Sequence, residues 1–195
     1  MKRFFDTLLI LLSFVIVLPL LILGLLLVVV FDGPPIFFLQ NRVGLNGKDF
    51  KVIKFRTMLV DLKSEKGIFN FENSSRVTNI GKLLRKTKLD ELPQLWNVLV
   101  GEMSIVGPRP EVRKWVDEFP DQWSVIHQVR PGITDPASII YRNEEQLLSQ
   151  VKYPEKYYRE KILPGKLALY QKYINERTII KDFFIIFKTI VALFK

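Results

Sequence analysis

The longest apolar stretch of the chain lies near its N-terminus, where residues 7–31 contain no charged side chain. Leucine, isoleucine and valine dominate it. A helix of about 24 residues rises roughly 36 Å, which is enough to cross a hydrocarbon core of about 30 Å. The stretch is too long for a cleaved signal peptide, and no cleavage pattern of small residues follows it. We therefore predict a membrane helix over residues 1–32.

Pro19 lies near the middle of this stretch and removes one backbone hydrogen bond, which predicts a kink or a break there. Lys2 and Arg3 precede the stretch, and Arg42 and Lys48 follow it, so both flanks are positive. The positive-inside rule then gives no single orientation for a spanning helix. A re-entrant hairpin with both ends on the cytoplasmic face satisfies both flanks. A kinked helix that spans the membrane is the alternative.

At the other end of the chain, residues 176–195 repeat apolar side chains at helical spacing and predict an amphipathic helix. Lys181 and Lys188 lie seven residues apart and hence on one face. Either this helix packs on the core of the domain, or it lies in the headgroup layer with its lysines toward anionic lipid. Its apolar positions are Ile179, Ile180, Phe183, Phe184, Ile186, Phe187, Ile190, Val191 and Phe194.

Between these segments the pattern predicts a compact, mainly helical α+β domain, so that the domain occupies residues 33–195 with the interfacial helix at its end. Residues 51–56 mix β-branched and aromatic side chains and predict a strand after a turn. Residues 76–88 form a basic amphipathic pattern, which predicts a helix whose charges either face solvent or hold phosphates. Residues 92–100 predict a further helix. The polar residues 64–75 lack periodicity and predict a mobile loop, while Gly107 and Gly132 predict turns.

Composition narrows the possible chemistry. The formal net charge of +9 suits nucleic acid, an anionic membrane surface or a phosphorylated substrate. Many aromatic residues lie in the two membrane segments rather than in a basic stripe, which argues against nucleic acid. There is no cysteine and a single histidine, His127, for which we predict a surface or packing role. Catalysis by thiols and metal sites built on several histidines are excluded, which leaves carboxylates, arginines, lysines and hydroxyls. That set is typical of enzymes acting on phosphates with oxygen-liganded Mg²⁺.

Two adjacent carboxylates, Asp90 and Glu91 (the acid pair), stand shortly before a Gly-Pro turn that carries Arg109. Adjacent helical residues point about 100° apart, so one carboxylate can attack or bind metal while its neighbour takes another role. An aspartate is ionised at neutral pH and needs no base in order to attack phosphorus. Acids in a first helical turn are also a routine helix start, because they favour the positive end of the dipole.

Five blocks of the chain stand out: residues 37–44 (FFLQNRVG), 50–58 (FKVIKFRTM), 89–98 (LDELPQLWNV), 101–110 (GEMSIVGPRP) and 129–134 (VRPGIT). In this order they resemble those of the bacterial sugar transferases, the monotopic phosphoglycosyl transferases that start glycan assembly on a polyprenol phosphate. The similarity runs from the N-terminal apolar segment to about Thr134. The residue before Pro19 is leucine where the family usually has serine, and residues 135–142 replace a glycine-containing stretch, so the identity of the sugar stays open.

The resemblance implies an N-terminal re-entrant hairpin in the bacterial inner membrane, with the catalytic domain on the cytoplasmic face. It further implies transfer of a sugar 1-phosphate from a UDP-sugar to undecaprenyl phosphate, for glycan, capsule, O-antigen or exopolysaccharide assembly. The matching aspartate, Asp90, would form a covalent phosphosugar and release UMP. Glu91 would either help Asp90 hold Mg²⁺ or deprotonate the acceptor. The alternative to an enzyme is a non-catalytic membrane scaffold of the glycan assembly machinery.

Arginines are the expected anion ligands, because a guanidinium pairs with phosphate through two hydrogen bonds and keeps its charge. Arg109 is held between two prolines and is our first choice for the nucleotide phosphates. Glu111 either orients an arginine or touches the nucleotide. For each predicted arginine, a surface position or a structural ion pair is the alternative to a ligand role. The further predicted phosphate or nucleotide ligands are Arg85, Arg56, Arg42 and Arg130.

Overall fold

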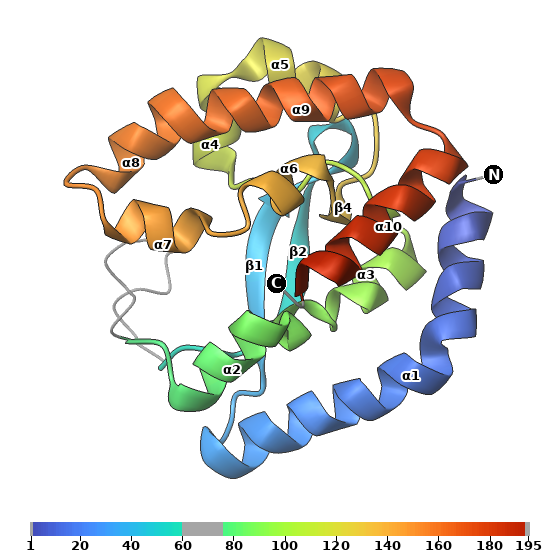
Figure 1. The fold of residues 1–195 in the computed structure, drawn as a ribbon, viewed down its shortest axis with the longest axis vertical. Coiled ribbons are helices and arrows are strands. Elements are labelled where there is room, and N and C mark those ends of the chain that lie inside the picture. The colour runs from blue at the N-terminus through green and yellow to red at the C-terminus, as the bar shows by residue number, and fades with distance from the viewer. Residues whose placement is uncertain (1, 60–75, 194–195) are drawn as a thin grey trace. The chain divides into compact units, whose positions relative to one another are not determined.

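The computed structural model of the chain describes residues 2–59 and 76–193 (Figure 1). The loop predicted within residues 60–75 therefore lies outside the described residues. Contacts divide the chain into two compact units, and each unit contains two segments of sequence. The first unit comprises Met1–Asn41 and Lys51–Gly101, and the second comprises Arg42–Phe50 and Glu102–Lys195.

The apolar N-terminal segment forms one helix, α1 (Lys2–Phe31), the one helix in the described part of the chain that is long and apolar enough to cross a membrane. The helix includes Pro19, and Figure 1 shows it changing direction along its length. Only 11% of its most apolar window is buried. The predicted long apolar helix is confirmed. Its re-entry to one membrane face, and the division of the chain at residue 32, stay predictions.

A β-hairpin follows α1, with strands β1 (Phe37–Val43) and β2 (Asp49–Phe55) joined by the turn η1 (Leu45–Gly47). Asn46 and Gly47 in this turn have φ values of 56° and 71°. Asparagine and glycine accept such positive values most readily. The strand predicted over residues 51–56 is thus part of a hairpin.

Three short elements complete the first unit: α2 (Asn79–Thr87), the 3₁₀ turn η3 (Leu89–Glu91) and α3 (Gln94–Val100). Thr78 caps α2 by accepting a hydrogen bond from a backbone N–H of its first turn (2.8 Å). Lys88 ends α2 in a left-handed conformation (φ 58°) and leads the chain directly into η3. The two predicted helices are confirmed, with the acid pair in the turn between them.

The core of the first unit joins α1 to these elements. Val28 of α1 packs with Phe55 and Leu84, and all three are at most 2% exposed. Gly24 permits the close approach, because a Cβ there would lie 2.6 Å from the Phe55 ring. A larger residue at position 24 would push α1 away from β2.

Both ends of α1 are attached to the same unit. Near its start, the Arg3 guanidinium donates hydrogen bonds to the carbonyl oxygens of Val98 and Leu99 in the last turn of α3. Just after its end, the Asp32 carboxylate accepts a hydrogen bond from the Thr78 hydroxyl (2.7 Å). A cation at a helix C-terminus satisfies carbonyls that lack intrahelical partners and complements the dipole. The two ends of α1 are therefore fixed to neighbouring elements of one compact unit.

The second unit contains two short parallel strands, β3 (Ser104–Val106) and β4 (Gly132–Thr134). The backbones of Gly107 and Gly132 approach each other closely beside these strands. A Cβ on Gly132 would lie 2.1 Å from the Gly107 nitrogen, so this position requires glycine. Gly132 thus lies in a strand rather than in the predicted turn, while Gly107 lies in a bend directly after β3. The helices of the unit are α4 (Arg113–Glu118), α5 (Pro120–Ile126), α6 (Pro136–Ile140), α7 (Glu144–Ser149), α8 (Pro154–Tyr157), the π-helical η4 (Tyr158–Ile162), α9 (Leu163–Glu176) and α10 (Ile179–Leu193).

Helix α10 is attached to the second unit by polar side chains and exposes its apolar ones. Among its described residues only Asp182 is buried (1% exposed), and it accepts a hydrogen bond from the Tyr173 hydroxyl (2.7 Å). A second polar contact joins Thr189 to Thr134 (2.7 Å). A helix packed on a core buries its apolar face instead. The apolar residues Phe183, Phe184, Phe187 and Ile190 of α10 are 50–58% exposed. The position of this helix in a headgroup layer stays a prediction.

Candidate active site

The acid pair lies in the tight turn η3 of the first unit. Asp90 and Glu91 are both buried, at 7% and 8% exposed. Lys88, in its left-handed conformation, fixes the start of the turn. Leu89 fixes its core side by packing against the cluster of Val28, Phe55 and Leu84. Two adjacent carboxylates are costly to bury without counter-charges, so such a pair is typical of a functional site.

Lys54 of β2 supplies a counter-charge that the sequence did not single out. Its Nζ lies 2.8 Å from Oε1 of Glu91, and the two side chains are only 21% and 10% exposed. The alternation of side chains along a strand could have indicated Lys54, because it stands two residues before Arg56 and hence on the same face of β2. The ion pair holds Glu91 in place and neutralises part of the buried negative charge.

Burial raises the pKa of Asp90 above its ordinary value, and the neighbouring charge of Glu91 raises it further. Lys54, Lys88 and Arg85 oppose this shift without reversing it. Asp90 Oδ1 is buried and has no hydrogen-bond partner among the described residues. A buried carboxylate oxygen of this kind gains when a cation approaches or when it forms a bond. The local electrostatics thus favour a positively charged or electrophilic ligand at Asp90.

The acid pair also fits a hard cation such as Mg²⁺. Mg²⁺ prefers oxygen ligands, and it is usually held by one or two carboxylates together with water and substrate phosphates. The unsatisfied Oδ1 of Asp90 can serve as one such ligand, while one oxygen of Glu91 is already engaged by Lys54. Within residues 2–59 and 76–193, no group of three or more Asp, Glu, His or Cys residues comes together. The remaining ligands would therefore come from phosphate and water.

Two predicted phosphate ligands share the first unit with the acid pair. Arg85 of α2 donates from Nε to the Thr57 hydroxyl (2.9 Å), and its charge acts on Asp90. Arg56 is buried and donates to the carbonyl oxygens of the two residues that follow α1 (2.6 Å each). Arg85 thus contributes to the electrostatics of the acid pair, whereas Arg56 holds the residues just after α1. Their roles in binding phosphate stay predictions.

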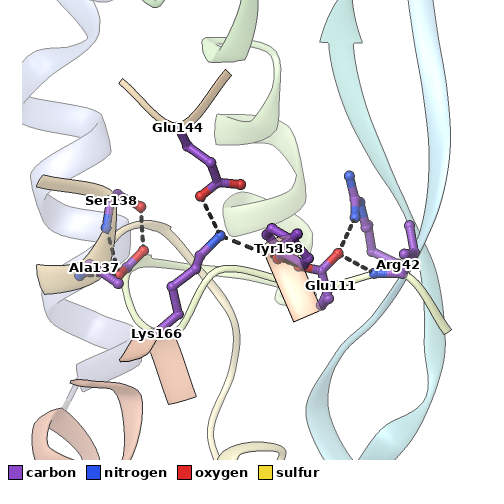
Figure 2. Close-up of polar contacts among 9 residues, drawn as sticks. Arg42, Glu111, Ala137, Ser138, Glu144, Tyr158 and Lys166 are labelled. Carbon is purple, nitrogen blue, oxygen red and sulfur yellow. Dashed lines mark hydrogen bonds and ion pairs between the residues drawn. The ribbon is translucent and has the colours of Figure 1, made fainter. Parts of the chain in front are cut away.

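Arg42 and Glu111 belong to the second unit, where Figure 2 shows them in a connected set of polar side chains. The charged and phenolic members of this set are buried or half-buried. Glu111 accepts hydrogen bonds from Arg42 (2.9 Å) and from the Tyr158 hydroxyl (2.5 Å). Lys166 donates to Glu144 (2.9 Å) and lies 3.4 Å from the Tyr158 oxygen. Acidic and basic groups alternate along this set, so that Arg42 on β1 is linked to α7 and α9.

The charges in this set are well defined. Burial favours a raised pKa for Glu111, but the charges of Arg42 and Lys166 and the hydrogen bond from Tyr158 outweigh it, and the pKa is lowered. Burial and the charge of Glu111 hold the pKa of Tyr158 well above its ordinary value. Glu111 is therefore ionised and Tyr158 protonated at neutral pH. The tyrosine hydroxyl is then fixed as a donor to the carboxylate.

We expect Glu111→Gln to destabilise the protein by about 3 kcal/mol, because it leaves the largely buried Arg42 without its counter-charge. For a chain of this size, that corresponds to a fall of about 6–12 °C in the melting temperature, measured by circular dichroism in detergent. The lowered pKa sets the pH dependence. The contribution of Glu111 is fully present above the ordinary pKa of glutamate, and it is lost as the pH falls through the lowered value.

The matched control is Glu155→Gln. It breaks the Lys114–Glu155 ion pair (2.8 Å), whose side chains are 47% and 50% exposed. Because solvent screens such a pair, we expect a loss of at most about 1 kcal/mol. Equal melting temperatures for the two variants would contradict a special role for the buried pair.

Arg109 lies on the Pro-flanked turn after β3 and lines a cavity of about 10 Å³ together with the rings of Trp123 and His127. These two rings stack at a centroid distance of 5.2 Å, which is the packing role predicted for His127. Burial lowers the pKa of Arg42 and the charge of Arg109 lowers it further, against the opposing charge of Glu111. Two guanidinium groups that repel each other in this way are stabilised when an anion binds between them.

The structure divides the predicted residues by unit. In the first unit the acid pair lies with Arg85, while Arg56 is engaged at the end of α1. In the second unit Arg42, Arg109 and Glu111 act on one another, while Arg130 is exposed just before β4. Three further residues that hold these groups were not predicted, and two of them lie outside every matched block of sequence. They are Lys54, Tyr158 and Lys166.

Comparison with known proteins places the chain in a family. The model of the family described as "Bacterial sugar transferase" matches residues 1–195, so the chain belongs to the bacterial sugar transferases. The exopolysaccharide production protein ExoY of Sinorhizobium fredii is 34% identical over 206 aligned residues, which cover 98% of this chain and 84% of that protein.

Two further relatives carry more specific names. The UDP-N-acetylgalactosamine-undecaprenyl-phosphate N-acetylgalactosaminephosphotransferase of Aeromonas hydrophila is 39% identical over 143 residues, covering 72% of this chain and 34% of that protein. The UDP-glucose:undecaprenyl-phosphate glucose-1-phosphate transferase of Klebsiella pneumoniae is 43% identical over 122 residues, covering 60% and 26%. The match thus spans only about a third or less of the length of these two relatives. Their names differ in the sugar and agree in the lipid carrier.

Proposed function

We propose that this chain transfers a sugar 1-phosphate from a UDP-sugar to undecaprenyl phosphate at a bacterial inner membrane, for polysaccharide synthesis. The observation that carries the proposal is the buried acid pair with its surrounding cations, in a chain that belongs to the bacterial sugar transferases. The names of the relatives support the donor class and the acceptor, because each joins a UDP-sugar to undecaprenyl phosphate.

In the proposed first step, a carboxylate oxygen of Asp90 attacks the phosphorus that carries the sugar. A P–O bond to Asp90 forms, the P–O bond to the nucleotide breaks, and UMP leaves with the electron pair. In the second step a phosphate oxygen of the acceptor attacks the same phosphorus and frees Asp90. The unsatisfied Oδ1 supports this role, since it has no hydrogen bond to break before it attacks.

The proposal includes Mg²⁺, which would neutralise charge on the diphosphate when bound. The residues that would hold it are Asp90 and Glu91. The chain's own cations act beside it. Lys54 keeps Glu91 oriented, and Arg85 lowers the cost of the negative charge on Asp90. The guanidinium groups of Arg42 and Arg109 are proposed to hold nucleotide phosphates, because phosphate relieves their mutual repulsion.

The test is UMP release by the detergent-purified chain, with undecaprenyl phosphate, Mg²⁺ and a panel of UDP-sugars. Release with one donor identifies the sugar that the sequence leaves open. A covalent step predicts in addition that UMP exchanges into the UDP-sugar when no acceptor is present, since the first step is reversible. Release that strictly requires the acceptor, with no exchange, would contradict the covalent intermediate and leave direct transfer.

We further propose that α1 re-enters the cytoplasmic face. The support is that Arg3 binds the end of α3 while Asp32 binds Thr78, so both ends of the helix are attached to one unit. A fully spanning helix would separate these ends by the thickness of the bilayer, about 30 Å of hydrocarbon.

Single cysteines at positions 2 and 34 test this topology, because the chain contains no cysteine of its own. We expect a membrane-impermeant maleimide to label both positions in inside-out vesicles and neither in right-side-out vesicles. Labelling of one position from each side would establish a spanning helix. A cysteine at exposed position 156 reports the side on which the second unit lies.

A further inference from the structure

A groove between α6 and α10 in the second unit has no place in the proposed reaction. The two helices contact each other, and Figure 1 shows them side by side. The groove has a volume of about 280 Å³. Four of its lining residues are apolar and two are cations, and no acid lines it: Ile139, Arg142, Phe187, Lys188, Val191 and Ala192.

The position of the two cations suits a phosphate at the mouth of an apolar site. Arg142 is held by a hydrogen bond from its guanidinium to the carbonyl oxygen of Ala192 (2.9 Å), which fixes its charge beside α10. Lys188 lies on α10 next to Phe187, and both side chains are exposed. A fixed guanidinium and a flexible ammonium around apolar walls match an anion that is carried on hydrocarbon.

The surface around the groove points to a lipid layer. Phe183 and Phe187 are each 58% exposed on α10, and Ile140 on α6 is 63% exposed. The polar contacts of Asp182 and Thr189 hold α10 in the orientation that exposes these rings. Helices with exposed apolar rings and flanking cations bind at the level of the headgroups in acidic membranes. Exposed apolar residues continue along α10 before the groove, at Ile179, Ile180 and Phe184, so this surface fits a layer of lipids better than a single isoprenoid chain.

We propose that the α6–α10 groove binds the phosphate of an acidic glycerophospholipid, with Arg142 and Lys188 as its ligands. The site fixes the second unit at a defined depth and rotation on the membrane, independently of α1. The proposal goes beyond the transfer reaction and does not depend on it. Undecaprenyl phosphate shares the same chemistry, a phosphate on a hydrocarbon chain, and is the competing occupant.

The test measures lipid retained by the full chain in neutral detergent, by native mass spectrometry, with phosphatidylglycerol and phosphatidylcholine as probes. We expect the wild type to prefer phosphatidylglycerol. The double variant Arg142→Gln, Lys188→Gln should lose about 30-fold of that preference, since each cation near an acidic lipid contributes roughly a factor of five. The single variant Lys188→Gln should lose about fivefold, and it disturbs no hydrogen bond of the described residues.

The matched control is Lys156→Gln, Lys161→Gln, which removes the same charge from exposed positions on α8 and η4. An equal loss in control and groove variants would show a general charge effect and overturn the site. Displacement of phosphatidylglycerol by an equimolar amount of undecaprenyl phosphate would assign the groove to the acceptor and overturn the proposal as stated. Because no turnover is measured, the result is independent of the proposed activity.

Discussion

Asp90→Asn is expected to lower the rate of UMP release by about 10⁴-fold or more, the range seen when a covalent nucleophile is removed. The amide is nearly the same size as the carboxylate, so the turn η3 keeps its shape. It cannot form the P–O bond, however, because the amide oxygen is a poor nucleophile. The measurement is the initial rate of UMP release with the donor that the wild type uses.

The stability of this variant separates chemistry from misfolding. Burial raises the pKa of Asp90, which means that its ionised form is destabilised in the folded protein. When the pKa of a carboxyl group is higher in the folded than in the unfolded protein, the free energy of unfolding falls as the pH rises above the ordinary pKa of that group. At neutral pH the uncharged amide of Asp90→Asn should therefore stabilise the fold. We therefore expect Asp90→Asn to melt at or above the temperature of the wild type. Substantial residual turnover in a folded variant would contradict the nucleophile and favour the scaffold alternative.

Removal of divalent metal by EDTA is expected to reduce UMP release by at least about 100-fold, and excess Mg²⁺ should restore it. The physical reason is charge. The two carboxylates of the acid pair and the diphosphate of the donor are all negatively charged and would repel one another. Lys54, Lys88 and Arg85 offset part of this negative charge at Asp90. A divalent cation both lowers the pKa of Asp90 and neutralises the leaving phosphate.

Ca²⁺ is the informative control for this experiment. It takes oxygen ligands at longer distances and in a looser geometry, so it should bind without full recovery of the rate. A second readout is the acid limb of the pH profile, which reports the ionisation of Asp90. It should move to lower pH as the Mg²⁺ concentration rises. A rate and a pH profile that are both indifferent to chelator would remove the metal from the mechanism.

The elements could be predicted where periodicity or turn residues decide the local structure. The long helix α1, the strand over residues 51–56 and the helices on both sides of the acid pair follow from such patterns. The orientation of α10 did not, because an amphipathic pattern does not say which face meets the protein. In the structure Asp182 and Thr189 face the second unit and the phenylalanines face outward.

The candidate site shows the same limit. Asp90, Glu91 and the arginines could be predicted because they stand in recognisable blocks of sequence. Lys54 and Tyr158 could not, because their importance comes from contacts across 37 and 47 residues of sequence. Arg56 stands in a matched block and is predicted to bind phosphate, and the contacts of its guanidinium with backbone carbonyls after α1 could not be read from the sequence. Its role toward phosphate stays a prediction.

The attachment of Arg3 to the last turn of α3 has a consequence for how the protein is made. Arg3 leaves the ribosome 95 residues before Val98, the residue whose carbonyl it binds. Helix α1 is therefore synthesised long before the partners of its first turn exist. The acid pair is synthesised only just before those partners. The attachment of the N-terminus is thus completed only after the acid pair itself has been synthesised, so a chain interrupted before residue 98 contains Asp90 and Glu91 but lacks the carbonyl groups that hold Arg3.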